Sequence, residues 1–283
     1  MNIGIIGLGL IGGSLGRSIV KNTNNTVFGT DIDKNVIIKA KLLKAINNEL
    51  CLEDYKKLDI VFVATNPITA TNIIKEICPK LKDGAIVMDC CGTKKIVVEC
   101  MQELKNKYNN LYFMGGHPMA GREFSTILHS VSNLFDRSYF LIVPVKADIK
   151  ILALVKELLL QIGCLNMVVT SSIKHDELIS YTSQLAHIVS SSYIKNPLYK
   201  EHVGYSAGSF RDMTRVAKLN PTMWTELMLE NKENLIKQIE NIVEHLEEYK
   251  LALQNNDSKE LFSLLEEGNT LKEQADKLHR QGV

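Results

Sequence analysis

The chain contains a glycine-rich loop whose one histidine is suited to acid-base chemistry. The loop reads GGHPMAG from residue 115 and follows the apolar run 111–114, which is typical of a strand. In an open α/β sheet, loops at the carboxyl ends of strands face the ligand crevice. A neutral imidazole there can hold and remove the hydroxyl proton of an alcohol that is oxidised by hydride transfer. We therefore expect His117 to be catalytic rather than a turn cap, because the glycines let a ligand approach closely.

A second candidate site lies near the N-terminus, where the hexapeptide GLGLIG follows an apolar run and opens a helical pattern. Such a hexapeptide gains meaning only between a strand and a helix. Gly7 would allow the tight turn, Gly9 the close approach of a pyrophosphate, and Gly12 the packing of helix on strand. The cofactor-binding residues expected here are Gly7, Gly9, Leu10, Ile11 and Gly12.

An acidic residue at the end of the next strand indicates which dinucleotide cofactor would bind. Asp31 ends the run VFGTD about 20 residues after the glycines, where a carboxylate accepts hydrogen bonds from ribose hydroxyls and repels a 2′-phosphate. The next residue, Ile32, cannot bind a phosphate. The pattern predicts NAD rather than NADP, and we expect Thr65 and Gly92, which follow later strands, to contact the cofactor as well.

The elements that position these residues follow a βαβ pattern up to about residue 170. Short β-branched runs alternate with amphipathic stretches, which predicts an α/β fold with a Rossmann-type, doubly wound parallel sheet. After Thr170 only long helical patterns remain, including one continuous stretch from Thr222 to Gln254. We predict an NAD-binding domain at 1–170 and an all-α substrate and dimerisation domain at 171–283, which would form a homodimer.

The bulk composition excludes several classes of partner. The 283 residues carry 33 basic and 32 acidic side chains, so no net positive field would attract nucleic acid or an anionic membrane. We expect no signal peptide and no membrane span, and the spacing of His, Cys, Asp and Glu predicts no metal site. The six cysteines lack a CxxC pair, which favours reduced thiols in a cytoplasmic protein.

Three separated motifs together resemble the prephenate and arogenate dehydrogenase family. They are the GLGLIGGSLG opening, the GGHPMAG loop and the stretch FRDMTRVA at 210–217. The similarity extends over most of the chain and includes DCCGTKK, the pair His175-Asp176 and PTMWTELMLENKEN. The resemblance implies oxidative decarboxylation of prephenate to 4-hydroxyphenylpyruvate with NAD, in tyrosine biosynthesis, without a metal.

The resemblance also assigns roles to single residues. His117 matches the family histidine that hydrogen-bonds the ring hydroxyl of the substrate, and Thr93 matches a hydroxyl residue beside it, usually a serine. Arg215 matches the residue that pairs with a substrate carboxylate, a role that a bidentate guanidinium suits. Glu123 corresponds to an acid near the mouth of the pocket.

The helical part departs from the family at two positions, Gln184 and Ala186. It reads Ser-Gln-Leu-Ala-His at 183–187, where many relatives have Ser-His-Leu-Pro-His. His187 is retained and would contact the substrate side chain, whereas Gln184 cannot titrate and affects the choice between prephenate and arogenate. Trp224 matches a position near the site, where packing is an equal explanation.

Three alternatives remain open at this stage. The first is an arogenate dehydrogenase. The second is a hydroxy-acid dehydrogenase, which commonly uses a catalytic lysine in its helical part; here the region near His175 to His187 offers Lys174 but no equivalent motif. The third is a non-catalytic NAD-binding sensor, which would have no reason to keep both His117 and Arg215.

Overall fold

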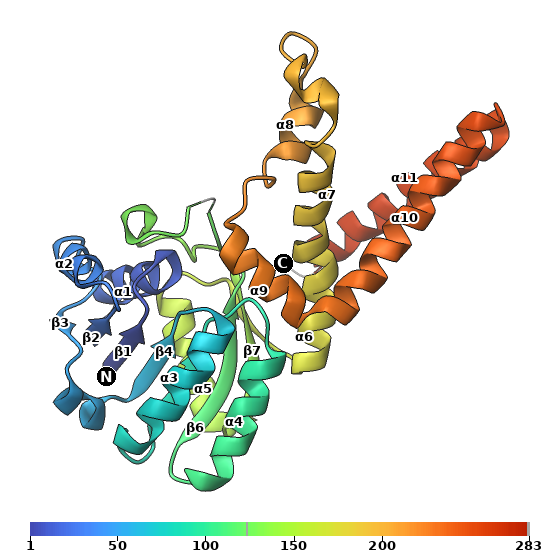
Figure 1. The fold of residues 1–283 in the computed structure, drawn as a ribbon. Helices are drawn as coiled ribbons and strands as arrows, with labels where there is room; N and C mark the ends of the chain where they lie inside the picture. The colour runs from blue at the N-terminus through green and yellow to red at the C-terminus, as the bar shows by residue number, and fades with distance from the viewer. Residues whose placement is uncertain (123, 282–283) are drawn as a thin grey trace. The chain divides into compact units, whose positions relative to one another are not determined.

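A computed structural model of the protein describes residues 1–122 and 124–281, and its N-terminal part is built on one eight-stranded sheet (Figure 1). The strand order is β3-β2-β1-β4-β5-β6-β7-β8. The order reverses at β1, where the chain has run outward to β3 and returns to β4, so a crevice opens at that point. The strands are β1 (Asn2–Ile6), β2 (Thr26–Thr30), β3 (Asn48–Glu49), β4 (Ile60–Val63), β5 (Ile86–Asp89), β6 (Tyr112–Pro118), β7 (Tyr139–Lys146) and β8 (Asn166–Val169).

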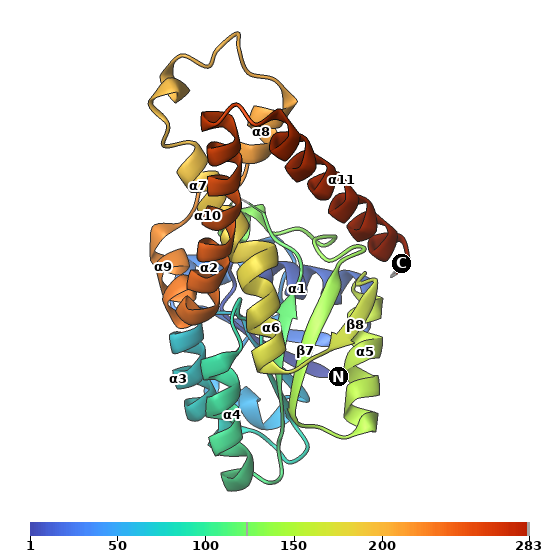
Figure 2. The same cartoon turned by 90° about the vertical axis from the view of Figure 1, so that its right-hand side faces the viewer.

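Helices cover both faces of this sheet, which confirms the doubly wound architecture. Alternate strand residues face opposite sides, so Ile60 and Phe62 of β4 belong to one buried core and Val61 and Val63 to the other. Figure 2 shows α3 and α4 on one side of the sheet and α5 on the other. The helices of this part are α1 (Leu10–Asn22), α2 (Lys34–Leu42), α3 (Pro67–Ile77), α4 (Lys95–Lys107) and α5 (Ile149–Gln161).

The sheet differs from the all-parallel prediction at one edge. β6 and β7 pair antiparallel, and β8 then pairs parallel to β7. A parallel partner requires a crossover, usually a helix. The 20 residues between β6 and β7 hold only the 3-10 turn η3 (Ile127–His129) among the residues described. The chain therefore turns back beside β6, and the segment from 119 onward lies near the end of that strand.

The helices after β8 begin with one nearly continuous rod. It comprises α6 (Ser172–Ile179), the π-helical turn η4 (Ser180–Leu185) and α7 (Ala186–Tyr193), and is followed by α8 (Gly208–Thr214) and α9 (Pro221–Glu230). The predicted continuous helix over 222–254 was wrong, because the chain breaks at Asn231. The amide of Asn231 donates to the Asp176 carbonyl and to Gln184 Oε1, which fixes this residue outside helical geometry.

The chain separates into two compact units after Lys232. The second unit holds α10 (Lys232–Gln254) from Glu233 onward and α11 (Ser258–Gln281). Within it, the Asp257 side chain accepts from the backbone N–H groups of Lys259 and Glu260 and so caps α11. None of the described helices combines the length and the apolar character that crossing a bilayer requires. The domain division at residue 170 remains a prediction.

Candidate active site

A cleft of about 910 Å³ at the carboxyl ends of the central strands collects most of the predicted site residues. One wall consists of the loops after β1, β4 and β5. The other consists of the end of β6 with the segment that follows it, η4, α7, α9 and the segment around residue 215. The predicted residues that line it are Gly9, Leu10, Ile11, Thr65, Gly92, His117, Gln184, His187, Arg215 and Trp224.

The loop after β1 has the geometry of a phosphate cradle. Gly7 has φ +89°, and a Cβ added at Gly12 would lie 1.9 Å from the Gly7 carbonyl oxygen. Only glycine fits at both positions. Asp31 Oδ2 accepts from Leu8 N at 2.8 Å, so the carboxylate holds the loop in place. Gly7, Gly12 and Asp31 do not line the cleft; they shape the backbone that does, and α1 begins there with Leu10 and Ile11. The Leu10 N–H donates to the Ser125 carbonyl at 2.8 Å.

His117, at the end of β6, is joined to two further residues in a buried chain of hydrogen bonds. Its Nδ1 lies 2.9 Å from His175 Nε2, and His175 Nδ1 lies 2.7 Å from Asp176 Oδ1. A carboxylate only accepts, so His175 donates from Nδ1 and accepts at Nε2. His117 must then donate from Nδ1, which leaves its Nε2 with a free lone pair. The chain therefore fixes the tautomer in which His117 can accept a proton from a ligand in the cleft.

Burial keeps both imidazoles uncharged near neutral pH. It lowers the pKa of His117 well below its usual value, and the neighbouring His175 ring and the Lys94 ammonium act in the same direction. Burial also lowers the pKa of His175, although the hydrogen bond to Asp176 opposes that effect. A neutral His117 is the form that can act as a base.

The turn between β5 and α4 holds the His117–His175–Asp176 chain of hydrogen bonds in place. The Asp176 carboxylate accepts from the backbone N–H groups of Lys94 and Lys95, at 2.8 and 2.9 Å. The Lys94 side chain is fully buried, where it pairs with Asp89 and donates to the Gly116 carbonyl at 2.7 Å. Because Gly116 precedes His117, the buried ion pair fixes the backbone that carries the imidazole.

Thr93 was expected to be catalytic, and the structure does not bring it to the cleft. The Thr93 hydroxyl donates to Glu230 Oε2 at 2.5 Å, and the side chain is buried beside α9. At this turn the cleft is lined by Gly92 instead, which has no hydroxyl. Glu123 lies outside the described residues.

The helical wall contributes fixed polar side chains. His187 Nδ1 donates to the Val216 carbonyl at 3.0 Å, and its ring centroid lies 4.1 Å from that of Trp224. Gln184 is buried, with its amide N–H donating to the Leu227 carbonyl and its oxygen accepting from Asn231. Gln184 thus forms part of the wall with both ends of its amide already bonded.

Several lining residues were not predicted from the sequence. Arg122 and Lys218 add two cations to that of Arg215, and Asn66 contributes an amide near the glycine loop. The pair His175-Asp176 was visible as a motif, but no spacing rule links it to His117, 58 residues earlier. The fold makes this link, because His175 on α6 contacts His117 at the end of β6.

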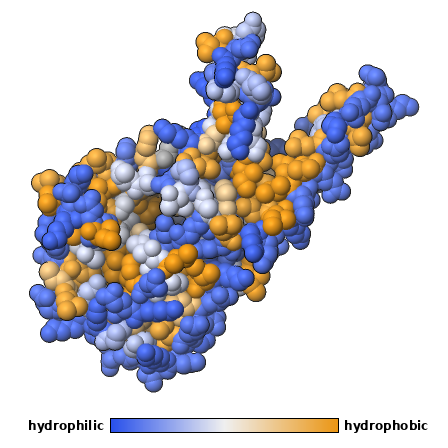
Figure 3. All heavy atoms as spheres, in the orientation of Figure 1, coloured by the Kyte–Doolittle hydropathy of each residue, from blue (hydrophilic) through white to orange (hydrophobic). Residues whose placement is uncertain are grey.

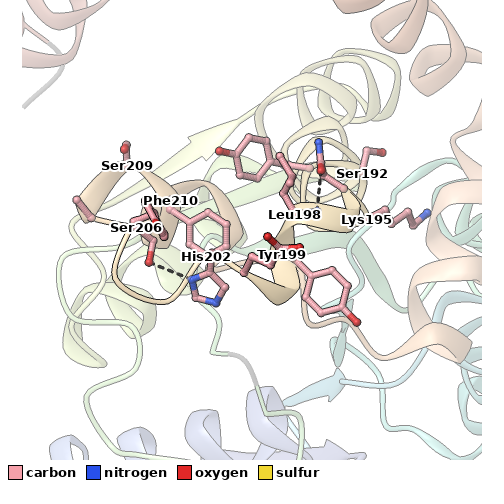
Figure 4. A pocket seen from close by; sticks show the side chains of 13 residues that line it. Ser192, Lys195, Leu198, Tyr199, His202, Ser206, Ser209 and Phe210 are labelled. Atoms are coloured by element: carbon pink, nitrogen blue, oxygen red, sulfur yellow. Dashed lines mark hydrogen bonds between the residues drawn. The ribbon is translucent and has the colours of Figure 1, made fainter.

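A second hollow, of about 880 Å³, lies between the end of α7 and the start of α8 (Figure 4). His202 stacks on Phe210 with ring centroids 4.6 Å apart, and its Nδ1 lies 3.0 Å from Ser206 Oγ. None of the predicted site residues lines this hollow. The predicted chemistry is therefore gathered in the first cleft.

Comparison with known proteins assigns the family. Residues 15–168 match the family model described as prephenate dehydrogenase, nucleotide-binding domain, and residues 171–267 match prephenate dehydrogenase, dimerization domain. A prephenate dehydrogenase of Lactococcus lactis is 30% identical, with 98% of this chain and 77% of that protein covered.

Solved structures agree with this match. The Aquifex aeolicus prephenate dehydrogenase in complex with hydroxyphenyl propionate and NAD+ superposes with a TM-score of 0.85 at 29% identity, over 97% of this chain and 98% of that one. The Synechocystis arogenate dehydrogenase gives 0.80 at 26% identity, over 97% and 100%. On these matches, and with an oxidoreductase site at the sheet's carboxyl edge, this chain belongs to the prephenate dehydrogenase family.

Proposed function

We propose that this protein is a cytoplasmic enzyme that oxidatively decarboxylates prephenate to 4-hydroxyphenylpyruvate with NAD as hydride acceptor, a step of tyrosine biosynthesis. The observation that carries the proposal is the His117–His175–Asp176 chain, which ends in a cleft lined by cations. The same observation argues against a non-catalytic sensor, which gains nothing from an oriented base. Family membership also favours this reaction over hydroxy-acid oxidation.

The proton chemistry follows from the tautomer of His117. Its Nε2 accepts the proton of the ring hydroxyl while hydride leaves the carbon that bears that hydroxyl. His175 and Asp176 stabilise the imidazolium that forms, as a second imidazole and a carboxylate can. The ring carboxylate departs as CO2, and its bonding electrons complete the aromatic ring. His117 then returns the proton to the phenolic oxygen.

The charges of the cleft support prephenate as the substrate. Arg122, Arg215 and Lys218 line it, and no Asp or Glu does so among the residues described. Arg215 is suited to pair with the ring carboxylate, which leaves two cations for the carboxylate of the keto-acid side chain. Arogenate carries an ammonium group on that side chain, which would lie among these cations without a matching anion.

The first wall of the cleft fits NAD. The glycine cradle and the N-terminus of α1 suit a pyrophosphate, and Asp31 suits an unphosphorylated ribose. When it is bound, NAD supplies the nicotinamide carbon that accepts the hydride. Thr65 and Gly92, on the loops after β4 and β5, would contact its nicotinamide end.

We also propose that the protein is a homodimer assembled through its C-terminal helices. α10 and α11 expose apolar side chains along their length, visible as orange patches among the polar surface (Figure 3). They include Ile236, Val243, Leu246, Leu253, Phe262, Leu265 and Leu271. Exposed apolar surface of this extent is typical of an interface.

The reaction is tested by mixing purified protein with NAD and prephenate and following NADH absorbance. We expect turnover with prephenate, and much less with arogenate or with NADP in place of NAD. A higher kcat/KM for arogenate would overturn the substrate assignment. Absence of turnover with both cyclohexadienyl substrates would refute the enzymatic proposal itself.

A further inference from the structure

Helix α9 carries two acidic side chains, one helical turn apart, that contact the cofactor wall of the cleft. Glu226 Oε1 accepts from the backbone N–H of Ile68 at 3.1 Å, and its Oε2 accepts from Asn66 Nδ2 at 3.3 Å. Asn66 precedes α3 and lines the cleft. A carboxylate at the N-terminus of α3 is also favoured by the helix dipole. Glu226 therefore fixes the loop after β4.

Glu230 makes the equivalent contact with the loop after β5. It accepts from the Thr93 hydroxyl at 2.5 Å, and burial of its carboxyl raises its pKa. Between the two acids, Leu227 packs on Gly92, because a Cβ added there would lie 3.3 Å from Leu227 Cδ2. The loops that carry Asn66 and Gly92 are thus both held by one helix.

The same helix forms part of the substrate wall. Trp224 and Leu227 line the cleft, and Trp224 packs on His187. The Leu227 carbonyl accepts from Gln184 Nε2 at 3.0 Å, which ties the end of α9 to η4. A displacement of α9 would therefore move side chains on the substrate wall together with two loops on the cofactor wall.

We propose that Glu226 and Glu230 are positioning residues through which α9 couples the binding of cofactor to the binding of substrate. A ligand that orders the loops after β4 and β5 would order α9 as well, and a second ligand would then bind to a wall already in place. The nature of the two ligands rests on the proposed function. The contacts that would transmit the coupling do not depend on the proposed function.

The test is a set of NADH fluorescence titrations with and without saturating hydroxyphenyl propionate, on wild type, Glu226→Ala, Glu230→Ala and the conservative Glu226→Gln. For the wild type we expect this compound to tighten NADH binding by about 5-fold or more. In the alanine variants NADH should bind about 5- to 20-fold more weakly, and the coupling should fall toward 1. Glu226→Gln keeps an acceptor for the Ile68 N–H, so its NADH affinity and coupling should lie between those of the wild type and Glu226→Ala.

Glu103→Ala, at an exposed position on α4, is the matched control and should leave both quantities unchanged. Alanine variants with a lower Tm but wild-type NADH affinity and coupling would overturn the proposal, because a purely structural role predicts that result. Equal NADH affinity with and without hydroxyphenyl propionate in the wild type would also overturn it. Prephenate turnover by the wild type is scored separately, so failure of the proposed function and failure of the coupling are distinguishable.

Discussion

The two walls of the cleft are built from different parts of the chain. The cofactor wall is mostly backbone, formed by glycines and the starts of helices, and the side chain of Asp31 holds the loop. The substrate wall is mostly side chains, carried by helices and held by hydrogen bonds between distant residues. Backbone sites are defined by local sequence, whereas side-chain sites depend on tertiary packing. The comparison predicts that damage to each wall should impair a different step.

The largest effect among single changes should come from Asp176→Asn on the substrate side. The Asp176 carboxylate accepts hydrogen bonds from His175 and from the backbone N–H of Lys95. The asparagine amide would turn its own N–H donors toward one of these two N–H groups. The favoured tautomer of His117 would be lost, and kcat should fall about 10²- to 10⁴-fold. Steady-state kinetics give the rate, and NADH titration should show nearly unchanged affinity. A rate within about 10-fold of wild type would remove the histidine chain from the mechanism.

Gly12→Ala should damage the opposite wall. The added Cβ would lie 1.9 Å from the Gly7 carbonyl oxygen, so α1 must move away from β1. We expect NADH binding to weaken by about 30- to 150-fold, which corresponds to about 2 to 3 kcal/mol of strain. Calorimetric titration measures the affinity, with Gly268→Ala on α11, where the space is open, as the control. Wild-type NADH affinity in Gly12→Ala would contradict the cradle.

Arg215→Ala should have a smaller effect, confined to substrate. Its side chain is exposed at the cleft, so loss of the ion pair should lower kcat/KM about 10- to 30-fold, mainly through KM. Lys218→Ala, measured in parallel, should lower kcat/KM by a smaller factor than Arg215→Ala if Arg215 binds the ring carboxylate. An unchanged KM in Arg215→Ala would be inconsistent with the assigned role.

The smallest expected effect is a dependence of stability on pH that arises from the substrate wall. The pKa values of His117 and His175 are lowered in the folded protein, so below about pH 6.5 the unfolded chain takes up protons that the folded chain resists. The free energy of unfolding should include the full contribution of the two neutral histidines above about pH 6.5. It should fall below that pH by at most about 1.4 kcal/mol per pH unit for each histidine.

Urea unfolding between about pH 5 and 8, on the wild type and on His175→Gln, measures this dependence. The variant should lose less of its stability as the pH is lowered through this range. Identical pH dependence in the two proteins would show that these imidazoles do not resist protonation in the folded state.

The contrast between the walls also explains what could be predicted from the sequence. The glycine cradle and Asp31 are local, and His117 lies at the carboxyl end of β6, so a rule of topology places it. The reversal of β7 was missed, because the alternating apolar pattern of a strand carries no information on its direction. The partnership of His117 with His175 was missed because it depends on the packing of α6. The side of the turn that Thr93 faces could not be predicted, since adjacent residues of a turn can point to either wall.

The central claim is that the two walls divide binding from chemistry, and His117→Asn tests it most directly when NADH affinity and turnover are measured on one preparation. The asparagine amide of this variant can still donate a hydrogen bond to His175, but it cannot accept a proton at neutral pH. We predict a loss in kcat of about 10²-fold or more with NADH affinity within about twofold of wild type. Retained turnover, or a parallel loss of NADH affinity, would contradict the division.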